Sequence, residues 1–250
     1  MERNPSHVAA DNLAALRNNP YPGRGIIVGL DETGQYIIQA YWIMGRSENS
    51  RNRFFITDED YGRVKTAIID LTKVKDTSLI VYTAMAEAHL KYVVSNGHQT
   101  LPVLNGKPGS DLNKLLLPWS YEPDNPNFTP RITAMIDLHC EDDVIAEFGI
   151  LSKSSLSEKC ERSIYNMPLK QPGLGYCVTT YSGDGDPLPP FEDAPYLMPL
   201  YGNISDITKI LWHALNEDNK ISLAVKFIDT KTGTSHIQIT NKYSQETTEA

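Results

Sequence analysis

Two neighbouring segments near the start of the chain are rich in β-branched and aromatic residues and are separated by a turn. They cover residues 25–29 and 35–44, and the sequence Asp-Glu-Thr-Gly at 31–34 joins them. This arrangement is typical of a β-hairpin. Residues 36–44 are apolar at almost every position. Because such a strand must be covered on both faces, we expect a central strand in a layered fold.

The same strand pattern recurs along most of the chain. Residues 53–57 and 63–71 suggest another hairpin, although the spacing of Tyr61, Val64 and Ile68 also suits a helix. Residues 131–139 alternate cleanly, as in a strand, with Ile132, Ala134, Ile136 and Leu138 facing one way and Arg131, Thr133, Met135 and Asp137 the other. Further strands are predicted over residues 78–85, 88–95, 144–151 and 175–181, with a closing hairpin over 220–229 and 234–241.

Helical periodicity is confined to short segments. We read residues 1–20 as an N-terminal extension that packs onto the body, since Val8, Leu13 and Leu16 are spaced for a helix. Residues 111–117 carry leucines on one side and end at a proline. Residues 205–216 are clearly amphipathic.

Strands outnumber helices, and short turns join consecutive strands, which favours mainly antiparallel sheets. The expected fold class is therefore α+β, a sandwich of sheets with helices outside. The chain shows no internal repeat and no shift in composition. We predict one domain over residues 21–244, followed by a disordered tail at 245–250.

Composition narrows the classes of function. The 250 residues include 23 Lys and Arg against 31 Asp and Glu, a net charge of −8, which disfavours binding to a nucleic acid polymer or an anionic membrane. The dispersed apolar residues predict neither a membrane span nor a signal peptide. Three cysteines without a CxxC pair fit a reducing compartment, so we expect a cytoplasmic protein.

The densest cluster of polar residues is the loop at 45–53, directly after the most apolar strand. Its guanidinium, hydroxyl and amide groups suit the oxygens of a phosphate, and they belong to Arg46, Ser47, Arg51, Asn52 and Arg53. Arg24 joins them if its strand neighbours the next strand. The alternative is a solvated turn held by ion pairs to Asp58, Glu59 and Asp60.

A second polar segment, residues 121–131, places Glu122 and Asp124 shortly before Arg131. Three prolines stiffen this loop. A carboxylate held rigidly beside a cation suits acid–base chemistry, whereas the alternative is a structural loop with capping Asp and Asn residues.

Two further turns carry candidate ligand groups. Residues 181–187 contain Asp184 in a Gly-Asp-Gly-Asp sequence, which suits a ribose or a calcium ion but is also typical of a tight surface turn. Residues 96–100 offer amide and hydroxyl groups, although His98 is equally compatible with a solvated turn.

Motifs for several reaction classes are missing from the sequence. It has no HxH, HExxH, GxSxG, P-loop or GxGxxG pattern, which argues against a metal site, serine hydrolysis, kinase chemistry and hydride transfer. The remaining possibility is a site that binds a small phosphate-bearing ligand through acid–base groups and hydrogen bonds.

The polar segments, taken in order, resemble the archaeal-type IMP cyclohydrolase family. They are residues 21–25, 40–47 with 50–53, 96–100, 122–132 and 179–189. The resemblance implies a four-layer α-β-β-α sandwich like that of the N-terminal-nucleophile hydrolases. It also implies closure of formamidoimidazole-carboxamide ribonucleotide (FAICAR) to inosine monophosphate with loss of water, the last step of de novo purine biosynthesis. A homo-oligomer, either dimer or tetramer, and no metal or organic cofactor are implied as well.

The same resemblance assigns roles to residues of this chain. Arg46, Arg51 and Arg53 would hold the phosphate or the developing negative charge, with help from Ser47 and Asn52. Tyr82 and Glu122 are the candidates for proton transfer, and together with Arg51 they form the expected catalytic set. The base and carboxamide of the substrate would be oriented by Asn96, Gln99, Thr100 and Arg131, and Asp184 would contact the ribose.

Two alternatives remain open at this point. One is a non-catalytic purine-nucleotide-binding protein on the same fold, and Glu122 and Tyr82 favour the enzyme over it. The other is a processed amidohydrolase, which an intact mass of the full chain would exclude.

Overall fold

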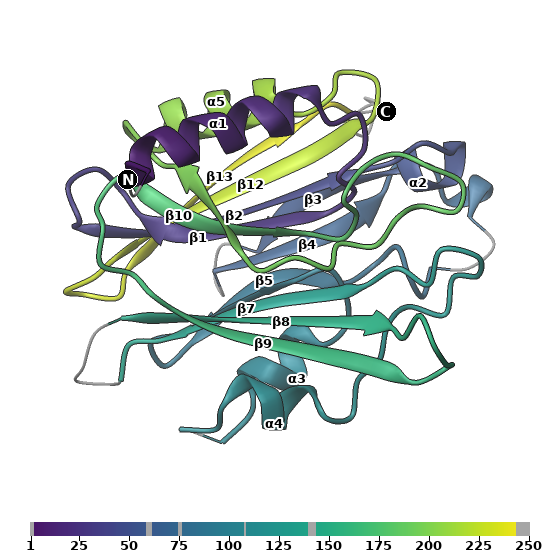
Figure 1. Cartoon of the computed structure of the whole chain (residues 1–250), viewed down its shortest axis with the longest axis horizontal. Helices are drawn as coiled ribbons and strands as arrows, with labels where there is room; N and C mark the ends of the chain where they lie inside the picture. Colours follow the sequence, from purple (N-terminus) through teal and green to yellow (C-terminus); the bar gives the residue numbers. More distant parts are fainter. Residues whose placement is uncertain (1–2, 59–61, 75–76, 108, 140–143, 244–250) are drawn as a thin grey trace, which may run out of the picture.

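The computed structural model describes residues 3–58, 62–74, 77–107, 109–139 and 144–243. Within these ranges two sheets lie face to face, and adjacent strands in both sheets run antiparallel (Figure 1). The six-stranded sheet has the order β11-β10-β1-β2-β12-β13. Its strands are β1 (Gly25–Leu30), β2 (Tyr36–Met44), β10 (Leu174–Thr179), β11 (Tyr196–Pro199), β12 (Lys220–Asp229) and β13 (Ser235–Asn241).

The seven-stranded sheet follows the sequence order from β3 to β9, so each strand pairs with the next one along the chain. Its strands are β3 (Arg53–Asp58), β4 (Arg63–Ile68), β5 (Thr83–Ala88), β6 (Lys91–Ser95), β7 (Arg131–Asp137), β8 (Ile145–Lys153) and β9 (Cys160–Pro168).

The helices lie on the outer faces of the two sheets, except for one turn near the loop between β2 and β3. They are α1 (Pro5–Asn18), α2 (Glu48–Arg51), α3 (Thr100–Leu104), α4 (Leu112–Leu116) and α5 (Ile204–Ala214), with a 3-10 turn η2 (Leu71–Lys73). In Figure 1, α1 and α5 cover the six-stranded sheet, whereas α3 and α4 cover the seven-stranded one. None of the helices among the described residues is long and apolar enough to cross a membrane.

Three clusters of apolar side chains fill the interfaces between these layers. One lies between the sheets and contains Tyr41 and Phe148. The second joins the six-stranded sheet to α1 and α5, and the third joins the other sheet to α3 and α4. Strand β2 shows why its sequence is apolar on both faces: Tyr41 lies in the first cluster and Trp42 in the second, and both are fully buried.

The predicted fold class is confirmed: the chain is α+β, with two mainly antiparallel sheets and helices outside them. The predicted helix in the N-terminal extension is confirmed as α1, which buries Leu13 and Leu16 against the body. The closer likeness to N-terminal-nucleophile hydrolases and the single domain over residues 21–244 stay predictions.

Within the ambiguous segment at 53–71, residues 53–58 and 63–68 pair as the hairpin of β3 and β4, so the helical alternative is wrong for residues 63–68. The strand predicted over residues 78–85 was placed too early, because β5 begins at Thr83. Thr66 explains the difference. Its hydroxyl donates to the carbonyl of Ile80 at 2.6 Å and accepts from the amide of Tyr82 at 2.8 Å, which holds residues 80–82 outside the regular ladder.

Two strands, β9 and β11, were not predicted. Strand β9 is an edge strand with exposed polar side chains, so its sequence lacks the apolar alternation that marks a half-buried strand. Strand β11 has four residues and follows a proline-rich loop. Cys140, the turn residues 59–61 and the predicted tail at 245–250 lie outside the described residues.

The packing of β1 against β2 yields a stability prediction at Gly25. A Cβ atom at Gly25 would lie 2.0 Å from Cζ2 of the buried Trp42. We therefore expect Gly25→Ala to lower the free energy of unfolding by about 1–3 kcal/mol, the usual cost of overpacking. Gly183→Ala is the matched control, because a Cβ there meets nothing within 4 Å. Urea denaturation of both variants measures the difference, and equal stabilities would contradict the prediction.

Candidate functional site

A cavity of about 420 Å³ lies where loops from both sheets meet. We call it the arginine cavity. Its walls come from the segment before β1, the loop between β2 and β3, the loop before β7 and the segment after β10. The predicted site residues that line it are Arg24, Arg46, Ser47, Arg53 and Glu122. Residues far apart in sequence are thus brought together, as the polar segments of the sequence suggested.

A buried ion pair lies at the wall of this cavity. Arg24 donates from Nη1 to Glu122 Oε1 at 3.0 Å and from Nη2 to Oε2 at 2.8 Å, which is a bidentate arrangement. Arg24 is 8% exposed and Glu122 is 2% exposed. Arg24 directly precedes β1 of the six-stranded sheet, whereas Glu122 belongs to the loop that leads into β7 of the other sheet, so the pair joins segments attached to the two sheets.

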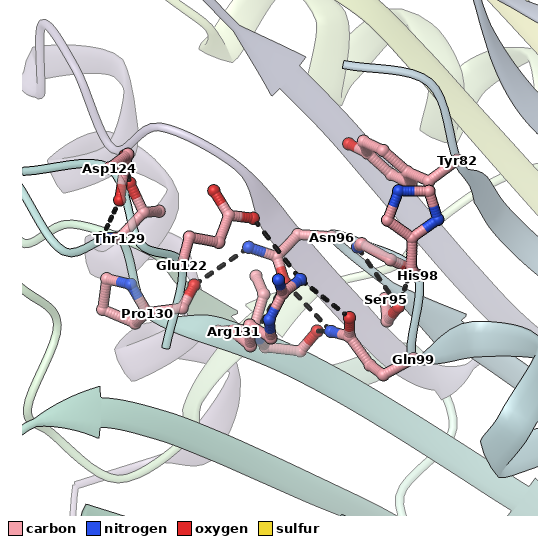
Figure 2. A network of polar contacts seen from close by, with 12 residues as sticks. Tyr82, Ser95, Asn96, His98, Gln99, Glu122, Asp124, Thr129, Pro130 and Arg131 are labelled. Carbon is pink, nitrogen blue, oxygen red and sulfur yellow. Dashed lines mark hydrogen bonds and ion pairs between the residues drawn. The ribbon is translucent and has the colours of Figure 1, made fainter. Parts of the chain in front are cut away.

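A second guanidinium supports the same carboxylate from behind. Arg131 Nη1 lies 3.8 Å from Glu122 Oε1 and donates to Gln99 Oε1 at 3.2 Å (Figure 2). The Arg131 guanidinium also lies 5.5 Å from the centre of the Trp119 ring. Arg131 is therefore held on three sides, and it positions Glu122 without lining the arginine cavity.

Burial and charge act against each other on these groups. Burial raises the pKa of Glu122 above its ordinary value, and the guanidinium groups of Arg24 and Arg131 oppose the rise. Burial also lowers the pKa of Arg131, opposed by Glu122. For Arg24, burial disfavours the charged form, but the carboxylate of Glu122 and nearby tyrosines keep the pKa well above its ordinary value.

The amide residues of segment 96–100 serve the frame of the site. Asn96 donates to the carbonyl of Pro130 at 2.9 Å and accepts from the amide of Ile132 at 2.8 Å, which ties β6 to the start of β7. Gln99 donates to Asn96 and accepts from Arg131 (Figure 2). The hydroxyl of Thr100 lies 2.5 Å from that of Ser95.

These three predicted substrate-binding residues, Asn96, Gln99 and Thr100, are fully buried. Their polar atoms are engaged by the protein itself, so the described structure places them behind the cavity wall instead of at its surface.

The three arginines of the loop at 45–53 have different surroundings. Arg46 is exposed, forms an ion pair with Asp184 and donates to the carbonyl of Gly185 at 3.0 Å. Arg51 donates from Nε to the carbonyl of Gly45 at 3.0 Å and from Nη2 to Asn219 at 3.3 Å. Arg51 is therefore held by the backbone of the loop and by Asn219, just before β12, and it is not among the residues that line the arginine cavity.

Arg53 is the most unusual of the three. It is 5% exposed, lines the arginine cavity and donates from Nη2 to the carbonyl of Met44 at 3.2 Å. Its Nε is buried without a hydrogen-bond partner. Within the ranges that the structure describes, no carboxylate pairs with it. A buried and uncompensated cation costs stability, and such a group is suited to an anion that enters from solvent.

Ser47 and Asn52 have structural tasks in the same loop. Ser47 caps the N-terminus of α2, where its hydroxyl accepts from the amide of Ser50 at 3.1 Å. Asn52 donates to the carbonyl of Asp70 at 2.7 Å and accepts from the amide of Asp70 at 2.8 Å. Ser47 still lines the cavity, whereas Asn52 clips β3 to the segment after β4.

Tyr82 lies just before β5, and its hydroxyl is 2.8 Å from that of Tyr41. Both side chains are buried, and the ring of His98 packs edge-on against Tyr82 at 6.5 Å. Burial raises the pKa of Tyr41 well above its ordinary value, and the neighbouring Tyr82 adds a smaller rise. The hydroxyl pair lies between the sheets, next to the arginine cavity and not among its lining residues.

Sequence reasoning missed several residues that line the cavity. Tyr21, Asn127, Thr129 and Tyr181 contribute aromatic, amide and hydroxyl groups to its walls. All four fall in segments already singled out as polar loops, but nothing in the sequence distinguishes their side chains from those that face solvent. Among the described residues, no group of three His, Cys, Asp or Glu side chains is placed to hold a metal ion.

Comparison with known proteins gives one finding about the family. Residues 21–232 match the model of a protein family described as IMP cyclohydrolase-like protein. No curated protein matches the chain. The matched range includes every predicted site residue, and it begins at Tyr21, the first residue that lines the arginine cavity.

Two Arg–carboxylate pairs in different surroundings give a matched test of the site. We expect Arg24→Met to lower the free energy of unfolding by about 3–5 kcal/mol, because it removes the bidentate partner of a buried carboxylate. Arg46→Met removes the exposed pair with Asp184 and should cost less than about 1 kcal/mol. Chemical denaturation monitored by circular dichroism measures both. If Arg24→Met lowers the free energy of unfolding no more than Arg46→Met does, the pair of Arg24 and Glu122 is not a buried, stabilising contact.

Proposed function

The chain belongs to the IMP cyclohydrolase-like family, and from this premise we propose that it closes FAICAR to inosine monophosphate with loss of water, the last step of purine synthesis. This makes the protein a hydrolase that acts on a cyclic amidine. The observation that carries the proposal is the arginine cavity itself. It combines the buried guanidinium of Arg53, which has no carboxylate partner within the described ranges, with the Glu122 carboxylate, which is held between the guanidinium groups of Arg24 and Arg131. The cytoplasmic location and the homo-oligomeric state of the protein stay predictions.

The reaction makes modest chemical demands. The carboxamide nitrogen of the substrate forms a bond to the formyl carbon, and the formyl oxygen leaves as water. That water takes one hydrogen from the carboxamide nitrogen and one from the formamide nitrogen. Since both reacting groups belong to one molecule, a site that holds them in contact supplies much of the acceleration. The remaining needs are a base for the nitrogen and donors for the oxygen.

Arg53 is the proposed anchor for the phosphate. Its guanidinium is already fixed by Met44 and buried in the cavity wall, so it loses little freedom when an anion arrives. Arg46 and the hydroxyl of Ser47 line the same cavity and would complete the phosphate contacts. The ion pair of Arg46 with Asp184 keeps this exposed arginine close to the cavity mouth, which gives Asp184 a positioning role.

Glu122 and Arg24 are proposed to act at the reacting atoms. Glu122 takes the proton from the carboxamide nitrogen, and burial keeps its pKa high enough for it to act as a base. The hydrogen bonds of Arg24 to Glu122 and Asn96 use three of its five N–H groups. The remaining N–H groups are suited to the negative charge that develops on the formyl oxygen.

The other predicted site residues support this pair. Tyr82 and its partner Tyr41 lie beside Arg24. Since neither lines the cavity, the proton transfer that the resemblance implied for Tyr82 stays a prediction. Asn96, Gln99 and Arg131 hold Glu122 in place through the network of Figure 2. Their contribution to the substrate is thus indirect.

The first prediction from this proposal concerns the phosphate anchor. We expect Arg53→Met to weaken the binding of inosine monophosphate by about 10–100-fold, the scale of a lost hydrogen bond to a charged group. Arg51→Met serves as the matched control, since it removes an equal charge from the same loop but away from the cavity lining. Isothermal titration calorimetry measures both. If Arg51→Met has the larger effect, the phosphate lies elsewhere in the loop.

The second prediction concerns proton transfer. Glu122→Gln preserves the shape of the side chain and removes its charge, so product affinity should stay within about tenfold while turnover falls roughly 100-fold or more. Formation of inosine monophosphate, followed by absorbance, measures turnover. Thermal unfolding of the variant separates a catalytic loss from a loss of folded protein.

The pH profile gives an independent check on Glu122. A base must be ionised, so the turnover of the wild-type protein should fall as pH drops through a pKa above the ordinary range of a glutamate. This acid limb should disappear in Glu122→Gln. Turnover of Glu122→Gln at the wild-type rate would assign the base to another residue. Nucleotide binding by the wild-type protein without any product would favour a binding protein over an enzyme.

A further inference from the structure

A chain of three hydroxyl and carboxylate groups lines the arginine cavity beside the buried ion pair. The Tyr181 hydroxyl lies 2.5 Å from Thr129 Oγ1, and Thr129 Oγ1 is hydrogen-bonded to Asp124 Oδ2. Asp124 Oδ1 also accepts from the amide of Thr129 at 2.7 Å (Figure 2). Tyr181, Thr129 and Asp124 all line the cavity, and we call them the hydroxyl chain.

The direction of the hydrogen bonds in this chain follows from the number of protons. An ionised carboxylate accepts hydrogen bonds and donates none, so the single hydroxyl proton of Thr129 goes to Asp124. Thr129 Oγ1 must then accept from Tyr181. Burial raises the pKa of Tyr181 to about 12, which keeps its proton in place. The Tyr181 oxygen is therefore left as a hydrogen-bond acceptor toward the cavity.

The position of that oxygen is fixed by packing. Gly23 has a φ of +73°, and a Cβ atom there would lie 2.5 Å from the Tyr181 ring, so the ring rests directly against the backbone. On another side the ring of Tyr21 stacks on it at 6.0 Å with an interplanar angle of 22°. Tyr181 is 4% exposed. A rigid acceptor of this kind discriminates between ligands that do and do not offer a donor.

The hydroxyl chain lies between the groups proposed to bind the two ends of the substrate. Toward the phosphate end, the guanidinium of Arg46 lies 5.0 Å from the centre of the Tyr21 ring, which stacks on Tyr181. Toward the reacting end, the carbonyl of Thr129 accepts from the amide of Glu122 at 2.9 Å. In a nucleotide, the sugar lies between the phosphate and the base. A sugar hydroxyl is therefore the donor that falls within reach of Tyr181.

We propose that the Tyr181 hydroxyl oxygen accepts a hydrogen bond from a ribose hydroxyl, which makes the arginine cavity selective for ribonucleotides over deoxyribonucleotides. This rests on the proposed function for the identity of the ligand. Tyr181 is then a specificity-determining residue, and Thr129 and Asp124 are positioning residues that keep its proton turned away from the ligand.

The test compares three nucleotides on two proteins by titration calorimetry. Wild-type protein should bind inosine 5′-monophosphate about 3–10-fold more tightly than its 2′-deoxy or its 3′-deoxy analogue, depending on which hydroxyl contacts Tyr181. Tyr181→Phe should lose this preference, binding the ribonucleotide as weakly as that deoxy analogue. A purely structural role for Tyr181 would weaken all three nucleotides equally and leave the preference intact.

Three further variants complete the experiment. Tyr176→Phe removes a hydroxyl from a tyrosine of β10 outside the cavity lining and should leave the preference unchanged. Thr129→Val breaks the hydroxyl chain and should reduce the preference, whereas Thr129→Ser, which keeps the hydroxyl, should retain it. Thermal unfolding shows whether each variant is folded at the temperature of the titration.

The outcomes separate this inference from the proposed function. If wild-type protein binds the ribonucleotide and forms product but has no preference over either deoxy analogue, the role of Tyr181 is overturned and the proposed function stands. The same holds if Tyr181→Phe retains the full preference. Failure of wild-type protein to bind inosine monophosphate at all overturns both.

Discussion

The buried ion pair of Arg24 and Glu122 is the interaction on which the site depends. It joins the segment before β1 in one sheet to the loop before β7 in the other, with two hydrogen bonds at 3.0 and 2.8 Å. Neither charge is stable alone at 8% and 2% exposure, so each requires the other in place. Both members of the pair line the arginine cavity, so the same contact that joins the two segments also forms part of its wall.

The polar groups around this pair fall into two sets with different physical tasks. One set forms hydrogen bonds to the backbone and within itself, which makes the wall behind the cavity rigid. It consists of Asn96, Gln99 and Arg131. Arg53, which pairs with no carboxylate among the described residues, and Tyr181, whose hydroxyl contacts Thr129, line the cavity itself. A preorganised frame with unsatisfied groups at its surface is the arrangement that favours binding and reaction of a small polar ligand.

Charge at the site runs against charge in the whole molecule. The chain carries a net charge of −8, yet one cavity is lined by three guanidinium groups, those of Arg24, Arg46 and Arg53, against two carboxyl groups, those of Glu122 and Asp124. A local positive region in an acidic protein attracts a phosphate-bearing ligand at short range, while the global field repels polyanions. This agrees with the family to which the chain belongs and with a mononucleotide ligand.

Sequence alone determined the fold class and the segments that form the site, because local periodicity and turn residues act over a few positions. The two-sided apolar pattern of β2 predicted its central place in a layered fold. The alternation of β7 predicted a strand, but both of its faces are buried because α3 and α4 cover the outer one. Which side chain of a polar loop reaches the cavity was decided by the tertiary structure. Arg51 and Arg53 are two residues apart, yet only Arg53 lines the cavity, since Gly45 and Asn219 hold Arg51 elsewhere. The direction of Tyr181 toward Thr129 likewise depends on contacts between the sheets, which no local pattern encodes.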